Sequence, residues 1–221
     1  TPVMFTRDFS STRKILLLSI LAGLFAAIIV GGMQFLILQN KHEQKMDAMM
    51  GGIRHWLVDY LADIKTTAES LQPLTLNECS DVASELTSRA AFTLNVRAFL
   101  LIKGQNAVCS SATGPMNVPL RDLIPEIDLN KNTDMAILPG TPMMPDKPSV
   151  VMWFRSPLLD DRGVFASLNI NLTPFLLYTT QQQDLNGIAL GIGNKAISTF
   201  APGLIDLQSL NTPPFRIAHI A

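Results

Sequence analysis

Charged residues are scarce in this sequence of 221 residues, at 16% against about 25% in an average soluble domain. The 17 basic and 18 acidic residues leave a net charge of −1. A protein that binds nucleic acid presents a concentrated basic surface, so this function class is excluded. Disorder is excluded for most of the chain, because 48% of the residues are hydrophobic and the net charge is low.

Cysteine and histidine are also rare. Two cysteines are too few for a disulfide-dense scaffold, and a structural zinc site would need help from histidine. The histidines His42, His55 and His219 lie far apart, and none neighbours a cysteine or a cluster of acids. No G-x-S-x-G nucleophile elbow occurs. We therefore expect no catalytic residue, no metal ion and no cofactor in this chain.

A long uncharged run is the most prominent feature that is present. Residues 15–38 (ILLLSILAGLFAAIIVGGMQFLIL) contain only Ser19 and Gln34 as polar residues. As a helix rising about 1.5 Å per residue, the run reaches about 36 Å and crosses a hydrocarbon core of about 30 Å. A buried helix of a soluble core rarely runs this long without a polar face, and a signal peptide has a shorter apolar stretch of about 7–15 residues. The run predicts an uncleaved membrane anchor in contact with lipid.

The flanks of the run predict its orientation. Arg7, Arg13 and Lys14 precede it with Asp8 as the only acid, whereas lysines and acids are mixed in residues 41–47. Positive residues are retained on the cytoplasmic side of a membrane, so we expect the N-terminus there. The predicted segments are a cytoplasmic tail over 1–14, a transmembrane helix over 15–38 and an exported domain over 39–221.

Small residues recur at four-residue spacing within the run, at Gly23, Ala27 and Gly31. Such a ridge lets two helices approach closely, which would make the protein a homodimer. Ordinary use of glycine and alanine in a membrane helix explains the same spacing, so both interpretations stay open.

Helical patterns open the exported part. Apolar residues recur at three- and four-residue steps through residues 39–71, and Pro73 ends the pattern. A second helix is predicted over residues 77–95, with Asn77 or Ser80 as its N-terminal cap.

Strand patterns follow the helices. Residues 115–148 hold seven prolines, and we expect an irregular connection there with one short helix near 120–124. The predicted hairpins join 97–103 to 107–111, 149–155 to 163–172 and 187–191 to 195–200, with a helix over 174–183 and a last strand over 215–221. This order predicts an α+β fold in which N-terminal helices pack on an antiparallel sheet, as in PAS-like and Cache-like sensors.

Cache-like sensors often bind small ligands on the face of the sheet. Arg97, Trp153 and Arg155 are candidates for such a site, since an arginine can grip a carboxylate through two hydrogen bonds. Charges on edge strands and a core tryptophan are the alternative interpretation of the same residues.

The two cysteines, Cys79 and Cys109, are 30 residues apart. Cysteines within one exported domain are oxidised in most cases, so a disulfide is expected between them. It would tie the second helix to the second strand of the first hairpin and stabilise the fold by about 3–4 kcal/mol. A structural staple and a redox-responsive bond both fit this pattern, because the sequence does not reveal the reduction potential.

Cys109 opens the run Cys109-Ser110-Ser111, which follows a strand pattern and an asparagine-containing turn. With the upstream cysteine and the N-terminal membrane helix, this motif resembles the CSS-motif domain, the extracytoplasmic sensor of many bacterial EAL-type cyclic di-GMP phosphodiesterases. The resemblance covers about residues 15–221. We expect the two serines to make hydrogen bonds at the end of the strand.

The resemblance implies that residues after about 39 lie in the periplasm, on the outer side of the bacterial inner membrane. It also implies that the periplasmic thiol-oxidising machinery forms the disulfide. The state of this bond would then regulate cyclic di-GMP hydrolysis by a cytoplasmic EAL domain, which makes the chain a redox or stress sensor. The alternative is a ligand-binding or interaction domain whose disulfide is purely structural.

The chain departs from the full pattern of the family. It contains no E-A-L or D-D-F-G run, and the sequence Asp160-Asp161-Arg162-Gly163 has the composition of a turn. A second membrane helix and the EAL domain are absent from it, and it begins with Thr1. We therefore expect a fragment or a natural truncation that does not hydrolyse cyclic di-GMP by itself.

Overall fold

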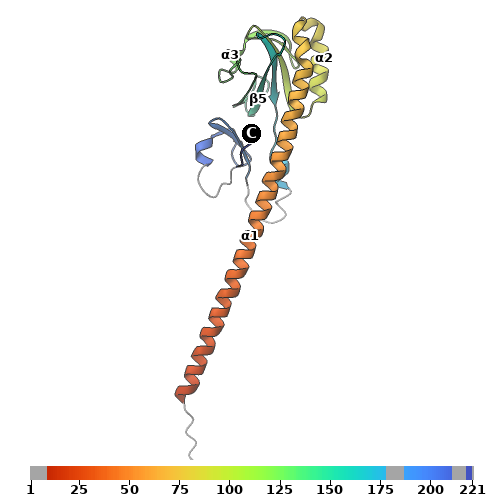
Figure 1. The fold of residues 1–221 in the computed structure, drawn as a ribbon. Helices are drawn as coiled ribbons and strands as arrows, with labels where there is room; N and C mark the ends of the chain where they lie inside the picture. The colour runs from red at the N-terminus through yellow and green to blue at the C-terminus, as the bar shows by residue number, and fades with distance from the viewer. Residues whose placement is uncertain (1–8, 178–186, 211–217, 221) are drawn as a thin grey trace, which may run out of the picture. The chain divides into compact units, whose positions relative to one another are not determined.

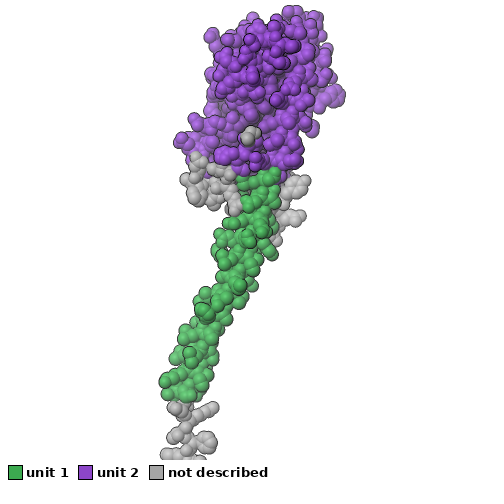
Figure 2. Space-filling view, viewed as in Figure 1, with its two compact units in different colours: residues 1–51 green, residues 52–221 purple. Residues whose placement is uncertain are grey.

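The computed structural model describes residues 9–177, 187–210 and 218–220 of the chain. It divides into two compact units, residues 1–51 and residues 52–221, which Figure 2 colours separately. The helix α1 (Phe9–Leu71) contains the boundary between them. Each unit is described by itself below.

The first unit carries the apolar run in helical form. Its most apolar window has a mean hydropathy of 2.6, and none of that window is buried. Leu17, Phe25 and Leu36, for example, are 59%, 67% and 63% exposed. The helix is long enough and apolar enough to cross a membrane, and lipid would cover the side chains that the protein leaves exposed.

In the second unit, the last turns of α1 bury one face. Leu57, Tyr60, Ile64, Ala68 and Leu71 recur at three- and four-residue steps and are 0–8% exposed. The helix ends at Leu71, just before Pro73, as the sequence predicts, and the short 3-10 helix η1 (Gln72–Leu76) follows it.

The second helix is shorter at both ends than the predicted range of 77–95. Helix α2 spans Cys79–Phe92, and Glu78 rather than Asn77 or Ser80 occupies its N-cap without a side-chain hydrogen bond. Asn77 instead closes η1, because its backbone N–H donates to Leu74 O at 3.2 Å. At the other end Asn95 has a positive φ of 58°, which is incompatible with a continuing helix.

The main sheet has six antiparallel strands in the order β3-β2-β1-β6-β5-β4. The strands are β1 (Val96–Lys103), β2 (Asn106–Ser110), β3 (Gly114–Pro119), β4 (Thr133–Leu138), β5 (Ser149–Arg155) and β6 (Arg162–Leu168). Helix α2 and the end of α1 lie along the same sheet (Figure 1). The α+β prediction is therefore confirmed.

Both faces of this sheet are buried, which explains why β5 and β6 read as continuous apolar runs. In β5, Phe154 belongs to the core that α1 and α2 cover, whereas Trp153 belongs to a second core on the opposite face. In β6, Ala166 and Phe165 divide in the same way. The predicted strand over 163–172 ends early, at Leu168.

The prolines of residues 115–148 obscured two strands, so the prediction of an irregular connection was wrong. This segment forms β3 and β4, whereas the short helix α3 (Leu120–Leu123) and the irregular stretches 124–132 and 139–148 match the expectation. Pro115 and Pro119 lie in β3, an edge strand of the sheet, where a missing N–H breaks no ladder. Strand β4 is the other edge and contains no proline.

The remaining residues form a smaller antiparallel sheet. It contains β7 (Ala189–Ile192), β8 (Lys195–Ser198) and β9 (Leu204–Asp206), followed by the 3-10 helix η2 (Leu207–Leu210). The predicted hairpin of 187–191 and 195–200 is confirmed, and β9 was missed. Helix α4 (Thr173–Leu177) begins the predicted helix over 174–183, but residues 178–186 lie outside the described residues. So does most of the predicted strand over 215–221.

Tyr60 links α1 to the start of the sheet. Its hydroxyl donates to Asn95 O at 3.0 Å, and its ring stacks on Trp56 with the centroids 5.2 Å apart. Burial raises the pKa of Tyr60 above its ordinary value of 10.0. Asn95 O also accepts the backbone N–H of Asn169 at 2.7 Å.

Tyr60→Phe is expected to lower the free energy of unfolding by about 0.5–1.5 kcal/mol at neutral pH, since Asn95 O keeps its second donor. The raised pKa means that the neutral phenol stabilises the fold fully below pH 10.0 and that this stabilisation fades as the pH rises further. Urea denaturation at about pH 7 and about pH 11 measures both effects. A variant as sensitive to alkali as the wild type would contradict this role of Tyr60.

Candidate functional site

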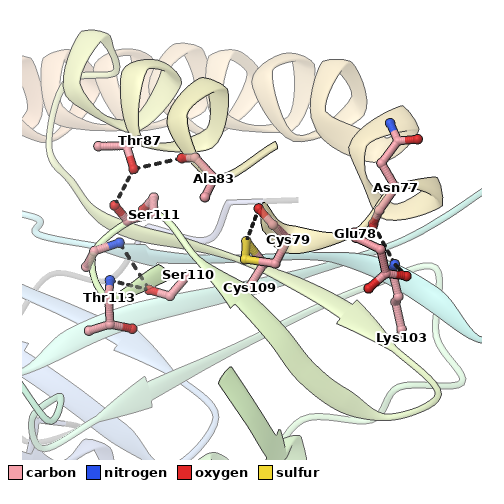
Figure 3. The surroundings of a disulfide bond; sticks show 11 residues. Asn77, Glu78, Cys79, Ala83, Thr87, Lys103, Cys109, Ser110, Ser111 and Thr113 are labelled. Atoms are coloured by element: carbon pink, nitrogen blue, oxygen red, sulfur yellow. Dashed lines mark hydrogen bonds and ion pairs between the residues drawn. A yellow bond between two sulfur atoms is a disulfide. The ribbon is translucent and has the colours of Figure 1, made fainter. Parts of the chain in front are cut away.

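The two cysteines form a disulfide with an S–S distance of 2.06 Å and a Cα–Cα distance of 5.3 Å. It joins Cys79, the first residue of α2, to Cys109 in β2, as the sequence predicts (Figure 3). Cys109 is fully buried, whereas Cys79 is half-buried at the edge of the core. The Cys109 side of the bond is therefore closed to an external thiol, and the Cys79 side is partly covered.

Burial also decides how the bond would break. Attack on the sulfur of Cys79 expels the thiolate of Cys109 into apolar surroundings, which disfavour a charged leaving group. Attack on Cys109 would release Cys79 at a helix N-terminus, which favours a thiolate, but that path is closed by the core. We infer that reduction needs a local opening between α2 and β2.

The serines of the motif fix the chain immediately after the disulfide. Ser110 Oγ accepts the backbone N–H groups of Ala112 at 3.1 Å and Thr113 at 3.3 Å, which closes the turn from β2 to β3. The expected role of this serine at a strand end is thereby confirmed. Thr113 and Ser110 are drawn together in Figure 3.

Ser111 makes contacts in two directions. Its N–H donates to Phe99 O at 2.9 Å, and its Oγ accepts the N–H of Phe99 at 2.9 Å. Its carbonyl oxygen accepts a 2.9 Å hydrogen bond from the hydroxyl of Thr87 in α2. The end of β2 is thus attached to α2 twice, through Cys79 at the first residue of the helix and through Thr87 farther along it.

Ser111→Ala is expected to cost about 1–3 kcal/mol, because the buried N–H of Phe99 loses its acceptor. Ser110→Ala is the matched control and should cost less, since Ala112 and Thr113 are exposed and their N–H groups can bind water. Denaturation of the oxidised proteins measures the difference. If both variants lowered the free energy of unfolding equally, the hydrogen bond from Phe99 N–H to Ser111 Oγ would not be the more important one.

Three side chains fasten η1, the segment between α1 and Cys79, to the sheet. Lys103 Nζ donates to Asn77 O at 2.6 Å and lies 4.0 Å from Glu78 Oε1 (Figure 3). Two further contacts are Arg162 Nη1 to Thr75 O at 2.6 Å and Gln72 Nε2 to Phe154 O at 3.0 Å. Only Asn77 and Glu78 separate η1 from Cys79, so these contacts and the disulfide attach neighbouring parts of the chain to the sheet.

The candidate ligand residues occupy two places. Trp153 and Arg155 line one pocket of about 340 Å³. Arg97 lies at the opposite end of the sheet, where its guanidinium donates to Lys147 O at 2.9 Å and Pro148 O at 2.8 Å. The strand register gives the separation, because Val96 pairs with Leu168 in β6 whereas Arg155 pairs with Gly163.

Four polar residues that line the same pocket were not predicted from the sequence: Gln105, Asn130, Asp160 and Asp161. They come from separate turns that only the strand pairing brings together, so no local pattern signals them. Within the described part of the chain, no group of three or more His, Cys, Asp and Glu could hold a metal ion.

The chain is similar in sequence to one known family and to two known proteins. Residues 42–219 match the family described as CSS motif domain associated with EAL. The chain is 51% identical over 218 residues to the probable cyclic di-GMP phosphodiesterase PdeN of Escherichia coli (strain K12), covering 99% of this chain and 42% of PdeN. It is 24% identical over 178 residues to the probable cyclic di-GMP phosphodiesterase PdeD of the same organism, covering 78% of this chain and 32% of PdeD.

This chain spans less than half the length of either relative. No solved structure matches it. Since the family match covers most of the sequence and includes both cysteines and both serines of the motif, the chain belongs to the family of CSS-motif domains associated with EAL.

Proposed function

We propose that this chain is the membrane-anchored periplasmic sensor region of a cyclic di-GMP phosphodiesterase, and that the Cys79–Cys109 disulfide regulates hydrolysis by a cytoplasmic EAL domain. The names of the two relatives support the enzymatic context. The apolar helix supports the anchor. A disulfide persists in oxidising compartments, which supports a periplasmic location at the bacterial inner membrane.

One observation carries the regulatory part of the proposal, namely that only Asn77 and Glu78 separate η1 from the disulfide at Cys79. Reduction consumes two electrons and two protons, breaks the S–S bond and leaves two thiols, while two molecules of an external thiol become a disulfide. The start of α2 is then held by Lys103 and no longer by Cys109. Because η1 connects this point to α1, the change in restraint would bias the helix that enters the membrane.

The reverse reaction belongs to the periplasmic thiol-oxidising machinery, which takes up the two electrons. A sensor of this type reports whether the envelope can maintain its disulfides. The buried Cys109 makes the response selective, since only conditions that open α2 from β2 would expose the bond.

The first experiment measures the state of the cysteines in untreated membranes. Alkylation before and after reduction should label neither cysteine in the first step and both in the second. Free alkylation of both in the untreated membrane would refute the bridge.

The second experiment measures regulation. The chain replaces the matching region of PdeN, and cyclic di-GMP hydrolysis is followed in membranes with and without dithiothreitol. We expect a change of rate on reduction in the natural sequence and none in the Cys79→Ser, Cys109→Ser double variant, with Ser80→Ala as the matched control. An unchanged rate in a domain that remains folded after reduction would leave the disulfide as a structural staple.

A further inference from the structure

A pocket of about 340 Å³ has Ile102 and Trp153 in its lining. Both residues belong to the core on the face of the sheet opposite the core that contains Cys109. The turn between β1 and β2 (Gly104, Gln105) and the turn between β5 and β6 (Asp160, Asp161) form part of its lining. Its volume falls within the range of about 300–1,000 Å³ that small-molecule sites have. The pocket therefore has the size of a site for a small metabolite.

The walls of the pocket are fixed by hydrogen bonds between segments that are distant in sequence. Gly104 N donates to Asp161 O at 2.7 Å, which joins the two turns. Trp153 Nε1 donates to Lys131 O at 3.1 Å, and Arg155 Nη1 donates to Asn130 O at 3.1 Å. A ligand would enter a preformed frame and would lose little free energy to ordering the protein.

Arg155 is the one basic side chain in the lining. Its Nη2 contacts Asp160 Oδ1 at 2.8 Å, and its Nε is buried without a hydrogen-bond partner among the described residues. The side chain of Asp160 is 92% exposed, so this ion pair is largely hydrated and contributes little stability. A carboxylate of a ligand could take the place of Asp160 and use the fork of donors that the guanidinium offers.

The two aspartates of the lining determine which second charged group the ligand needs. Two aspartates, Asp160 and Asp161, stand against Arg155 in the lining, and Asp161 Oδ1 also lies 3.8 Å from Nε of Arg162, which is outside the lining. A dicarboxylate would be repelled, and a simple amine would leave the guanidinium without a new partner. A carboxylate at Arg155 and an ammonium group at the two aspartates satisfy both signs of charge.

Apart from Gly104 and the uncharged polar residues Gln105 and Asn130, the rest of the lining is apolar. Ile102 and Leu129 line the pocket together with the indole of Trp153. These groups favour an aliphatic substituent on the ligand. We propose that the pocket binds a zwitterionic α-amino acid with an apolar side chain.

The site borders the segment that the disulfide restrains. Lys103, which holds Asn77 O, directly precedes Gly104, and Arg162, which holds Thr75 O, directly follows Asp161. An amino acid bound between these turns would stabilise the hydrogen bonds from Lys103 and Arg162 to the segment of η1. The binding itself does not depend on redox regulation, and either proposal can fail without the other.

The test uses fluorescence of the full chain in detergent micelles. The sequence holds two tryptophans, so Trp56→Phe leaves Trp153 in the pocket wall as the only reporter. L-leucine should change its emission in a saturable way. Isoamylamine, which lacks the carboxylate, and 4-methylpentanoic acid, which lacks the ammonium group, should each bind at least about tenfold more weakly, the effect of one lost charge-assisted hydrogen bond.

Variants in the same background locate the binding. Arg155→Gln should weaken leucine binding at least about tenfold, and Asp161→Asn several-fold, whereas Arg121→Gln, an exposed arginine outside the pocket, should leave it unchanged. Circular dichroism confirms that each variant is folded. The proposal is overturned if L-leucine and the other apolar L-amino acids give no saturable change, if 4-methylpentanoic acid binds as well as leucine, or if Asp161→Asn and Arg155→Gln both bind like the wild type.

Discussion

Replacing Cys79 and Cys109 together by serine is expected to lower the free energy of unfolding of the second unit by about 3–4 kcal/mol. The bond closes a loop with a sequence separation of 30 residues, and its loss returns that conformational freedom to the unfolded chain. Because an ordinary domain has a stability of about 5–15 kcal/mol, the variant would lose a large fraction of it. The serine at position 109 adds a further cost, since its hydroxyl enters a fully buried place.

Urea denaturation of the wild type with and without dithiothreitol measures the same bond without a mutation. The reduced wild type should approach the double variant, and the double variant should not respond to dithiothreitol. Ser80→Ala, an exposed neighbour of Cys79, controls for changes at the start of α2 and should stay within about 0.5 kcal/mol of the wild type. A loss of less than about 1 kcal/mol on reduction would show that α2 and β2 hold together without the bond.

Phe99→Ala is expected to cost about 3–5 kcal/mol. Phe99 lies in β1 and is fully buried in the core that α1 and α2 cover on the sheet. Removing the ring leaves a cavity in a close-packed core, which also contains Ile64 and Leu86, and the surrounding elements close such a cavity only in part. The backbone of Phe99 also holds both hydrogen bonds to Ser111, so relaxation around the cavity would disturb the motif.

Phe92→Ala is the matched control, because it removes the same ring from a side chain that is 88% exposed at the end of α2. It should change the free energy of unfolding by no more than about 0.5 kcal/mol. Both variants are compared in the oxidised state by urea denaturation. Similar losses at the two positions would contradict the placement of Phe99 in the core.

The sequence predicted elements well where local signals are strong. Strand β5 has the predicted bounds, since its apolar run is interrupted at both ends, and α1 ends just before Pro73. The prediction failed in residues 115–148 because proline is tolerated on an edge strand, and only the completed sheet shows which strands lie at the edge.

The candidate site, too, was predictable from the sequence only in part. The disulfide was predictable because only two cysteines exist in the chain. The partners of Ser111 were not, because they depend on the irregular register between Leu101 and Ile102 where β1 pairs with β2. Asp160 and Asp161 were predicted only as part of a turn. Their pocket could not be predicted, because a distant turn with Gly104 and Gln105 also lines it.

The hydrogen bond between Thr87 and Ser111 has a consequence for the reduced protein. If reduction cuts the covalent link, we expect this hydrogen bond to keep α2 on the sheet while the first residues of the helix move away from β2. The two thiols then stay at a high effective concentration with respect to each other. Re-oxidation would be an intramolecular closure that needs no search for the correct partner, and the domain could cycle repeatedly between its two forms.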